Sequence, residues 1–269
     1  MCRDCGCTIM AEHHHHHHHH HHHDHHDHTH PHDHSHMHDH HHDHGHDHEH
    51  RMISVEESLF QKNAHLAFHN RELFQQRDWK VFNMMSSPGS GKTTLLCSLL
   101  PLLKKTHSLA VIVGDQETSL DAERMQAAGI ASHQINTHSA CHLDAERVGN
   151  LLRGLELHPK TWIFIENVGN LVCPAVFDLG EAKKIAVLSV TEGEEKPLKY
   201  PVLFQDADLI VITKSDLLPH LDFDSKLLEK NLRTQNKKAP IVFCSARTGQ
   251  GLSDLAQTLE KMLDETKCA

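Results

Sequence analysis

The chain has 269 residues and a formal net charge of −10, of which −7 falls on residues 1–51. No basic patch favours a nucleic-acid partner, and no run of 18 apolar residues favours a membrane span. The N-terminus has no apolar segment of the secretory kind, which predicts a cytoplasmic protein. Its eight cysteines then point to metal or redox chemistry before disulfides.

Residues 1–12 form a first segment with a cysteine cluster at Cys2, Cys5 and Cys7, next to the α-amino group. Three thiolates and one amine offer four donors to a single metal ion. A square-planar arrangement of these donors suits Ni²⁺ and a tetrahedral one suits Zn²⁺, and the sequence leaves both open. A reduced terminus without metal is the simpler alternative.

Residues 13–50 form a second segment that contains 26 of the 34 histidines. Eleven consecutive histidines resemble a purification tag, but the irregular Asp-His pairs that follow do not look engineered. The segment cannot bury apolar surface, so we expect it to be disordered. Most of its imidazoles are neutral near pH 7 and can bind Ni²⁺, Cu²⁺ or Zn²⁺. We interpret it as a metal buffer, with a solvated spacer as the alternative.

Residues 52–269 have the composition of one α/β domain. A capping box from Ser54 to Glu57 and apolar residues at helical spacing predict a helix over 54–76, and further helices are expected at 121–128 and 142–157. The predicted strands cover residues 81–85, 109–113, 130–135, 161–166, 185–190, 209–213 and 240–244. Apolar strands that alternate with helices indicate a mostly parallel sheet covered on both faces, with ligands at the carboxyl ends of its strands.

A glycine-rich loop follows the first predicted strand, and a helix is expected from Leu95. This order is typical of a phosphate-binding P-loop, although Ser86 stands where the strict motif begins with glycine. Backbone amides of the loop and the helix N-terminus favour an anion, Lys92 can reach the terminal phosphates, and the Thr93 hydroxyl can bind Mg²⁺. The predicted nucleotide-binding residues here are Gly89, Ser90, Gly91, Lys92, Thr93 and Thr94.

Two later segments indicate that the base is guanine. Asp216 follows the sixth predicted strand and can accept both N1–H and N2–H of guanine, and Lys214 can lie along the base plane. After the seventh strand, Ser245 and Ala246 can offer a backbone amide to guanine O6. These segments resemble the N-K-x-D and S-A elements of GTPases, with Thr213 in place of asparagine, so that one supporting hydrogen bond is expected to be lost.

Carboxylates also end two strands beside the loop. Asp115 and Glu166 can hold Mg²⁺ directly or through water, and Asp115 could instead orient the attacking water. Glu166 to Gly169 occupies the place of a GTPase switch segment, in which the Gly169 amide can donate to the γ-phosphate. We therefore expect Lys92, Asp115 and Glu166 to act in hydrolysis.

Three residues suggest a second metal site. Cys141 and His142 lie at the start of a predicted helix, whose N-terminus would favour a thiolate, and Cys173 lies just beyond the switch segment. Together they could bind one ion in a manner linked to nucleotide state. The alternative is that these cysteines are structural, as we expect for Cys97 and Cys244 in apolar stretches.

With these elements placed, the sequence resembles the HypB family, GTPases that deliver nickel to [NiFe]-hydrogenase. The resemblance covers residues 52–269 and the first seven residues. It is carried by the cysteine cluster, the P-loop and four further segments: Gly114–Gln116, Cys141–Asp144, Phe164–Pro174 and Ser189–Gly193. Family members commonly have either the cysteine cluster or the histidine tract, and this chain has both.

The resemblance implies a SIMIBI-class P-loop fold, slow GTP hydrolysis with Mg²⁺, and a GTP-dependent homodimer with contacts at Leu217 and Leu221. It also implies a tight nickel site at Cys2, Cys5 and Cys7, and a weaker nickel or zinc site at Cys141, His142 and Cys173. The partners it implies are a hydrogenase maturation protein and the hydrogenase large subunit. Two other functions are alternatives to nickel delivery for hydrogenase: a urease-type nickel GTPase, and a nickel storage protein with vestigial GTP binding.

Overall fold

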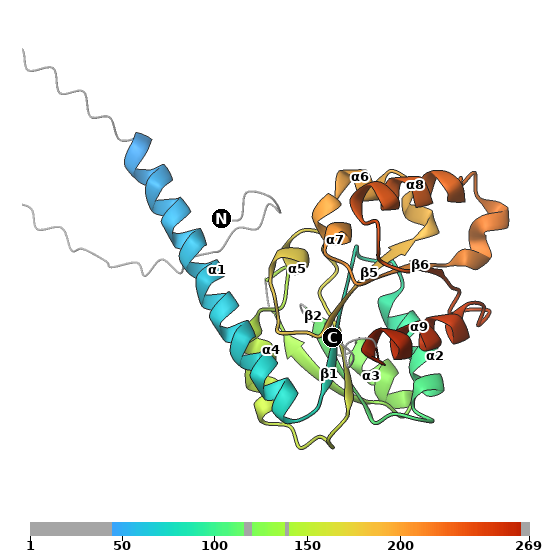
Figure 1. Ribbon diagram of the computed structural model, residues 1–269, viewed down its shortest axis with the longest axis horizontal. Helices are drawn as coiled ribbons and strands as arrows, with labels where there is room; N and C mark the ends of the chain where they lie inside the picture. Colours follow the sequence, from blue (N-terminus) through green and yellow to red (C-terminus); the bar gives the residue numbers. More distant parts are fainter. Residues whose placement is uncertain (1–44, 116–119, 138–139, 265–269) are drawn as a thin grey trace, which may run out of the picture.

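The computed structural model describes residues 45–115, 120–137 and 140–264 (Figure 1). The predicted cysteine cluster and most of the histidine-rich tract lie outside these ranges. In the described part, seven strands form one parallel sheet in the order β3-β2-β4-β1-β5-β6-β7. The strands are β1 (Lys80–Ser86), β2 (Leu109–Asp115), β3 (Ala131–Asn136), β4 (Trp162–Glu166), β5 (Lys183–Ser189), β6 (Leu209–Thr213) and β7 (Ile241–Phe243).

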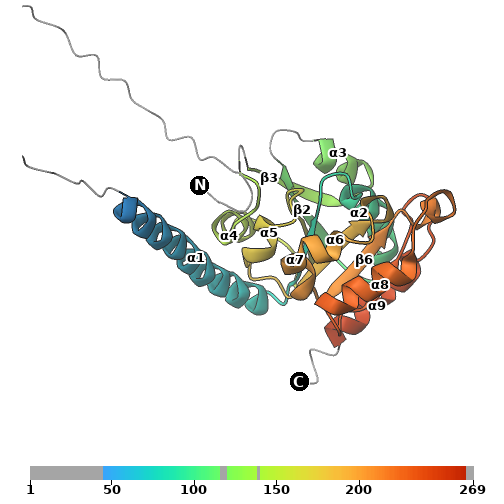
Figure 2. The ribbon, with the colours of Figure 1, turned by 90° about the horizontal axis from the view of Figure 1, so that it is seen from above.

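Helices connect these strands and cover both faces of the sheet (Figures 1 and 2). The α-helices are α1 (Gly45–Gln76), α2 (Lys92–Leu103), α3 (Leu120–Ala127), α4 (Ala145–Arg153), α5 (Cys173–Val176), α6 (Lys196–Lys199), α7 (Pro201–Gln205), α8 (Ser225–Gln235) and α9 (Leu252–Asp264). Two 3₁₀ helices, η1 (Val190–Glu192) and η2 (Ser215–His220), follow β5 and β6. None of the described helices combines the length and apolarity needed to span a membrane.

The core has two layers because neighbouring strand residues point to opposite faces. Phe82 and Met84 of β1 pack with residues of α2, α3 and α9 on one face. Val81 of β1 packs on the other face with residues of α1 and α4, and Met85 with residues of α5, α7 and α8. Both faces of the central strands are therefore buried, as the continuous apolar runs predicted.

The seven strands lie within about two residues of their predicted positions, but the helices predicted over 54–76 and 142–157 differ more. The first helix begins at Gly45, so residues 45–50, which we expected to be disordered, are helical. No glycine or proline occurs between residues 46 and 76, and each added residue extends the hydrogen-bond ladder. The helix predicted over 142–157 is shorter, because Asp144 caps it and Gly154 ends it.

Helix α1 is about 48 Å long, and its N-terminal half extends away from the body of the protein (Figure 1). Two buried asparagines attach its other half. Asn63 accepts a hydrogen bond from the Ala145 amide at 3.0 Å and donates one to the Asp178 carbonyl at 2.8 Å. Asn70 donates to the carbonyls of Ala145 and Leu179 at 2.7 and 3.0 Å. These bonds join α1 to the start of α4 and to the segment after α5.

Candidate functional site

The loop between β1 and α2 has the backbone of a phosphate cradle. Gly89 and Gly91 have φ angles of +74° and +96°, a region that favours glycine. Gly91 is also the N-cap of α2, so the helix begins at Lys92, three residues before the predicted start. The loop therefore lies at a helix N-terminus, where backbone amides and the helix dipole favour an anion.

Ser86, the departure from the strict motif, provides a hydroxyl beneath this loop. The Lys92 ammonium donates a hydrogen bond to Ser86 Oγ at 2.7 Å, and the Ser90 hydroxyl donates to the same atom. Ser86 is fully buried, and its own hydroxyl donates to the Ser87 carbonyl at 2.7 Å. The serine thus orients the lysine, a role that glycine could not provide.

Oxygen donors meet where the loop passes the end of β4. The Thr93 hydroxyl donates to Glu166 Oε1 at 2.7 Å, and both side chains are buried. The pair forms because β1 and β4 are adjacent and both end at this edge of the sheet. A hydroxyl beside a carboxylate fits the oxygen ligands that Mg²⁺ prefers. Asp115 is the last residue of the next strand, β2, and the prediction for its carboxylate stays untested.

The segment after β4 packs directly against the phosphate loop. A Cβ added to Gly169 would lie 3.0 Å from Pro88 Cα and 3.1 Å from Pro88 N, so a larger residue here would require the loop or this segment to shift. The next residue, Asn170, forms an antiparallel bridge with Ser86. The predicted switch segment and the loop are therefore in contact. Thr94, by contrast, is exposed on α2, where its Oγ1 accepts a hydrogen bond from Arg124 at 3.5 Å.

The residues after β6 also contact the loop. The Thr213 hydroxyl donates to the Ser90 carbonyl at 2.6 Å, so threonine supplies a loop contact of its own where the sequence suggested a loss. Lys214 has a left-handed φ of 58°, and its ammonium donates to the Gly89 carbonyl at 2.8 Å. Its side chain lies 3.9 Å from the position of a Gly91 Cβ, above the phosphate loop.

Asp216 meets the loop that follows β7. The Ser245 hydroxyl donates to Asp216 Oδ1 at 2.6 Å, and the Arg247 guanidinium lies 3.7 Å from Oδ2. The hydrogen bond from Ser245 lowers the pKa of Asp216 below its usual range. The Ala246 carbonyl accepts a hydrogen bond from Ser98 of α2 at 3.1 Å, which holds this loop beside the P-loop helix.

One contact of the phosphate loop was not predicted from the sequence. The Ser87 hydroxyl donates to Glu192, whose other oxygen accepts from the Ser189 amide at 3.0 Å. Ser189 and Glu192 form a capping box around η1. The Ser-x-x-Glu spacing was visible in the sequence, but its proximity to the loop depends on the pairing of β1 with β5.

The structure brings Cys141, His142 and Cys173 together. Their ligand atoms all lie within 4.8 Å of one another, and Cys141 Sγ is 3.5 Å from His142 Nδ1. The expectation that Cys141 starts a helix is wrong, because α4 begins only at Ala145 and Cys141 lies in the loop before it. The first residue of a helix is instead Cys173, in the single turn of α5.

The surroundings of this cluster are partly apolar. The ring centroids of His142 and Phe177 lie 3.9 Å apart, and those of Phe177 and Phe60 of α1 lie 5.1 Å apart. Burial lowers the pKa of His142, so its imidazole stays neutral and able to bind a metal. Two thiols and one imidazole fit a nickel or zinc ion. Cys244, by contrast, is buried in the core, and burial raises the pKa of its thiol to about 12.

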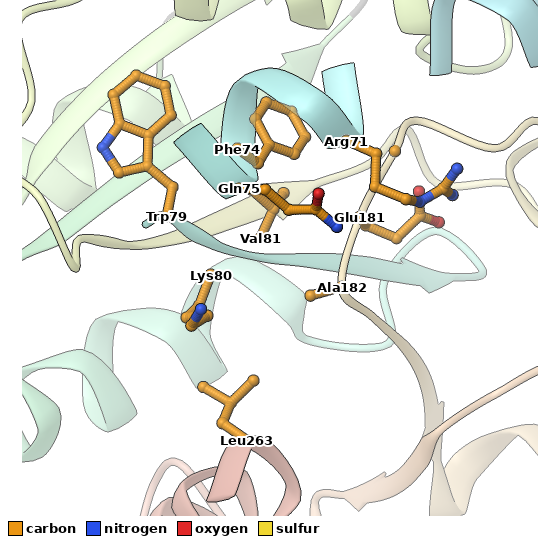
Figure 3. Close-up of a pocket in the computed structure, with 10 residues that line it drawn as sticks. Arg71, Phe74, Gln75, Trp79, Lys80, Val81, Glu181, Ala182 and Leu263 are labelled. Carbon is orange, nitrogen blue, oxygen red and sulfur yellow. The ribbon is translucent and has the colours of Figure 1, made fainter. Parts of the chain in front are cut away.

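A cavity of about 320 Å³ lies at the opposite edge of the sheet (Figure 3). Its walls include Phe74 near the end of α1, Trp79 just before β1, Lys80 at the start of β1, and Glu181 before β5. These residues lie at the amino ends of the strands, whereas all the predicted nucleotide-binding residues lie at the carboxyl ends. Ligands of parallel sheets bind at the carboxyl ends, so the cavity is separate from the candidate site.

The fold and the loop together define a P-loop nucleotide-binding protein. Residues 80–243 match the family model described as the CobW/HypB/UreG nucleotide-binding domain. The hydrogenase maturation factor HypB of Azotobacter chroococcum is 49% identical over 211 residues, which cover 78% of this chain and 69% of that protein. HypB of Escherichia coli is also 49% identical, over 78% of this chain and 72% of that one.

Two solved structures agree with this assignment. A crystal structure of HypB from Helicobacter pylori in complex with nickel has a TM-score of 0.71 and 38% identity, over 76% of this chain and 96% of that one. HypB from Archaeoglobus fulgidus has a TM-score of 0.70 and 33% identity, over 76% of this chain and 99% of that one. The chain therefore belongs to the HypB family, as its motifs predicted.

Proposed function

We propose that this protein is a GTP-hydrolysing nickel metallochaperone that delivers nickel during maturation of [NiFe]-hydrogenase. One observation carries the proposal. A single short segment, residues 166–173, meets the Thr93 hydroxyl at Glu166, packs on Pro88 at Gly169 and supplies Cys173 to the metal cluster. A change in the phosphates at the loop would therefore move a metal ligand.

The proposed nucleotide is GTP. The Asp216 carboxylate would accept from guanine N1–H and N2–H, and its low pKa keeps it ionised for this role. The Ser245 amide already donates to the Gln250 carbonyl, which leaves the Ala246 amide as the donor to guanine O6. Lys214, held above the loop, would pack along the base plane.

The proposed hydrolytic residues are Lys92, Asp115 and Glu166. The Lys92 ammonium would stabilise charge that develops on the terminal phosphates, and the Gly169 amide would donate to the γ-phosphate. Thr93, Glu166 and Asp115 would hold Mg²⁺, which neutralises phosphate charge when bound. Asp115 could alternatively orient the attacking water.

The proposed cargo is Ni²⁺, with Zn²⁺ as the alternative ion at Cys141, His142 and Cys173. This donor set is soft enough for either metal, and the similar HypB of Helicobacter pylori was crystallised with nickel. We further propose that Cys2, Cys5 and Cys7 form a second, tighter nickel site. Residues 13–50 would then act as a buffer of many weak, exchangeable sites.

The proposed partners are a second copy of the chain, a hydrogenase maturation protein and the hydrogenase large subunit, all in the cytoplasm. The similar relatives carry the name hydrogenase maturation factor, which supports the hydrogenase assignment. Leu221, one of the two leucines proposed for the GTP-dependent homodimer, is 38% exposed. Leu217 is partly buried against the core and would contribute less.

Nickel delivery to urease is the second candidate function. A relative in Helicobacter pylori, 37% identical over 77% of this chain, carries the name hydrogenase/urease maturation factor HypB. Deletion of the gene should abolish hydrogenase activity and leave urease activity intact, and added nickel should partly restore the former. Loss of urease activity alone would overturn the hydrogenase proposal.

GTP turnover separates the metallochaperone from a nickel storage protein. The purified chain should hydrolyse GTP slowly with Mg²⁺, and Lys92→Ala should abolish turnover while nickel binding persists. A gene with Lys92→Ala should fail to restore hydrogenase activity. Full restoration by this variant would mean that nickel storage, and not GTP hydrolysis, is the function.

A further inference from the structure

Helix α1 carries two histidines one turn apart on its exposed face. His65 and His69 have their Nε2 atoms 3.2 Å apart, and their rings meet edge to face with centroids 4.5 Å apart. Residues i and i+4 of a helix lie on the same side, which explains why the two rings meet. The buried residues of α1, such as Asn63 and Asn70, lie on the opposite side of the helix.

Glu72 orients one of the two rings. Its Oε2 lies 3.1 Å from His69 Nδ1, again one turn along the helix. An ionised carboxylate can only accept a hydrogen bond, so His69 Nδ1 carries the proton and a neutral ring directs its Nε2 lone pair toward His65. A carboxylate bound to the second ring nitrogen is the usual support of a metal-binding histidine.

The separation of the two nitrogens fits a shared metal ion. Two nitrogens bound at about 2.0–2.1 Å, at angles of about 90–110°, lie about 2.8–3.4 Å apart. The observed 3.2 Å falls within this range without movement of the backbone. Imidazole pairs suit Ni²⁺, Cu²⁺ and Zn²⁺, whereas Mg²⁺ and Ca²⁺ prefer oxygen ligands.

We propose that His65 and His69 form a binding site for one divalent transition-metal ion, with Glu72 as a positioning residue and water in the remaining coordination positions. Without metal, the His65 Nε2–H donates to His69 Nε2. On binding, His65 carries its proton on Nδ1 instead, so both Nε2 lone pairs face the ion.

This site is separate from the cluster of Cys141, His142 and Cys173, which lies on loops beside the sheet. It occupies the helix that leads from the histidine-rich tract into the domain, and His65 is the first histidine after His50 in the sequence. The first histidines that follow the tract in the sequence therefore form a helical chelate, to which the tract would transfer an ion. This transfer role rests on the proposed nickel function, but the binding itself does not.

Modification of histidines by diethylpyrocarbonate tests the site in the full chain. Trypsin releases residues 63–71, which contain His65 and His69 and no other histidine, and residues 154–160, which contain only the exposed His158. We expect a Ni²⁺ titration to protect both histidines of the first peptide, while His158 reacts equally with and without metal. Equal modification of the two peptides at every Ni²⁺ concentration would overturn the proposal.

Three variants sharpen the test. His65→Gln should abolish protection of His69, because a single imidazole cannot chelate. Glu72→Gln should raise the Ni²⁺ concentration needed for half protection about tenfold or more. His158→Gln, the matched control, should change neither. Unchanged protection of His69 in the His65→Gln variant would contradict a shared ion. All three variants should retain the GTP turnover of the unchanged protein. If the unchanged protein itself does not hydrolyse GTP, the proposed function is wrong, but the histidine site is not affected by that result.

Discussion

The side-chain amide of Asn167 donates a hydrogen bond to Asn83 Oδ1 over 3.1 Å in the interior of the protein. Asn167 Oδ1 in turn accepts from the backbone amides of Leu143 and Val168. Asn83 donates onward to Glu181 at 3.1 Å. Backbone amides can only donate, so the direction of the whole chain of hydrogen bonds is determined. It connects the segment after β4 to the loop that carries Cys141 and His142.

Asn167→Leu should destabilise the fold by several kcal/mol. The change leaves the amides of Leu143 and Val168 and the oxygen of Asn83 without their partner, at about 1–3 kcal/mol for each buried group. Urea denaturation measures this loss. Asn150→Leu, on the exposed face of α4, is the control and should cost less than about 0.5 kcal/mol. Equal effects of the two changes would mean that the buried chain does not stabilise the fold.

Asp216→Asn should shift nucleotide preference from GTP toward XTP, because the new amide offers a donor where guanine also presents one. Competition binding measures the ratio of the two affinities. In the unchanged protein, Ser245 holds the pKa of Asp216 below its ordinary 3.8, so the carboxylate stays ionised as the pH falls from 7 to 5. GTP selectivity should therefore be constant over this range. An unchanged ratio in the variant would refute the assignment of Asp216.

Thr213→Val should weaken nucleotide binding by roughly 2- to 10-fold, the usual net value of one hydrogen bond. The variant keeps the shape of the side chain but loses the donor to the Ser90 carbonyl. Thr213→Ser retains the hydroxyl and serves as the control. Titration with a fluorescent GDP analogue compares the two. If the Thr213→Val and Thr213→Ser variants bind the GDP analogue equally well, the Thr213 hydroxyl does not support the phosphate loop.

Gly169→Ala should slow GTP turnover and weaken GTP binding. The added methyl group would press on the Pro88 backbone at 3.0–3.1 Å, so either the phosphate loop or the segment after β4 must shift. Gly154→Ala is the control, because its nearest neighbour would lie at 3.5 Å, an ordinary contact. Steady-state kinetics with both variants should separate them. Normal turnover in Gly169→Ala would show that close packing here is not needed.

The two cysteine sites should behave as independent metal centres. Replacement of Cys2, Cys5 and Cys7 by serine should remove the tight nickel site and leave GTP turnover intact. Cys173→Ser should instead weaken the second site and change its dependence on bound nucleotide. Nickel titrations with GDP and with a non-hydrolysable GTP analogue provide the comparison. Loss of both sites in either variant would contradict two separate centres.

Local sequence was sufficient for the elements that depend on near neighbours. The apolar strands could be located because a strand covered on both faces must be apolar at nearly every position. Gly89 and Gly91 could be placed in a tight loop because few other residues adopt a positive φ. The spacing of His65 and His69 was also visible in a predicted helix, although its meaning became clear only with the Glu72 contact.

Tertiary structure decided which distant groups meet. Cys173 lies 31 residues beyond His142 in sequence, and the two approach only because the segments after β3 and β4 lie at the same edge of the sheet. Threonine in place of asparagine at position 213 was expected to lose one supporting hydrogen bond. The Thr213 hydroxyl instead donates to the Ser90 carbonyl, because β6 ends beside the phosphate loop. Sequence patterns report the burial and backbone preference of each residue. A hydrogen bond or a metal site between distant residues requires a separation of a few ångströms, which only the packing of strands, helices and loops in the folded chain determines.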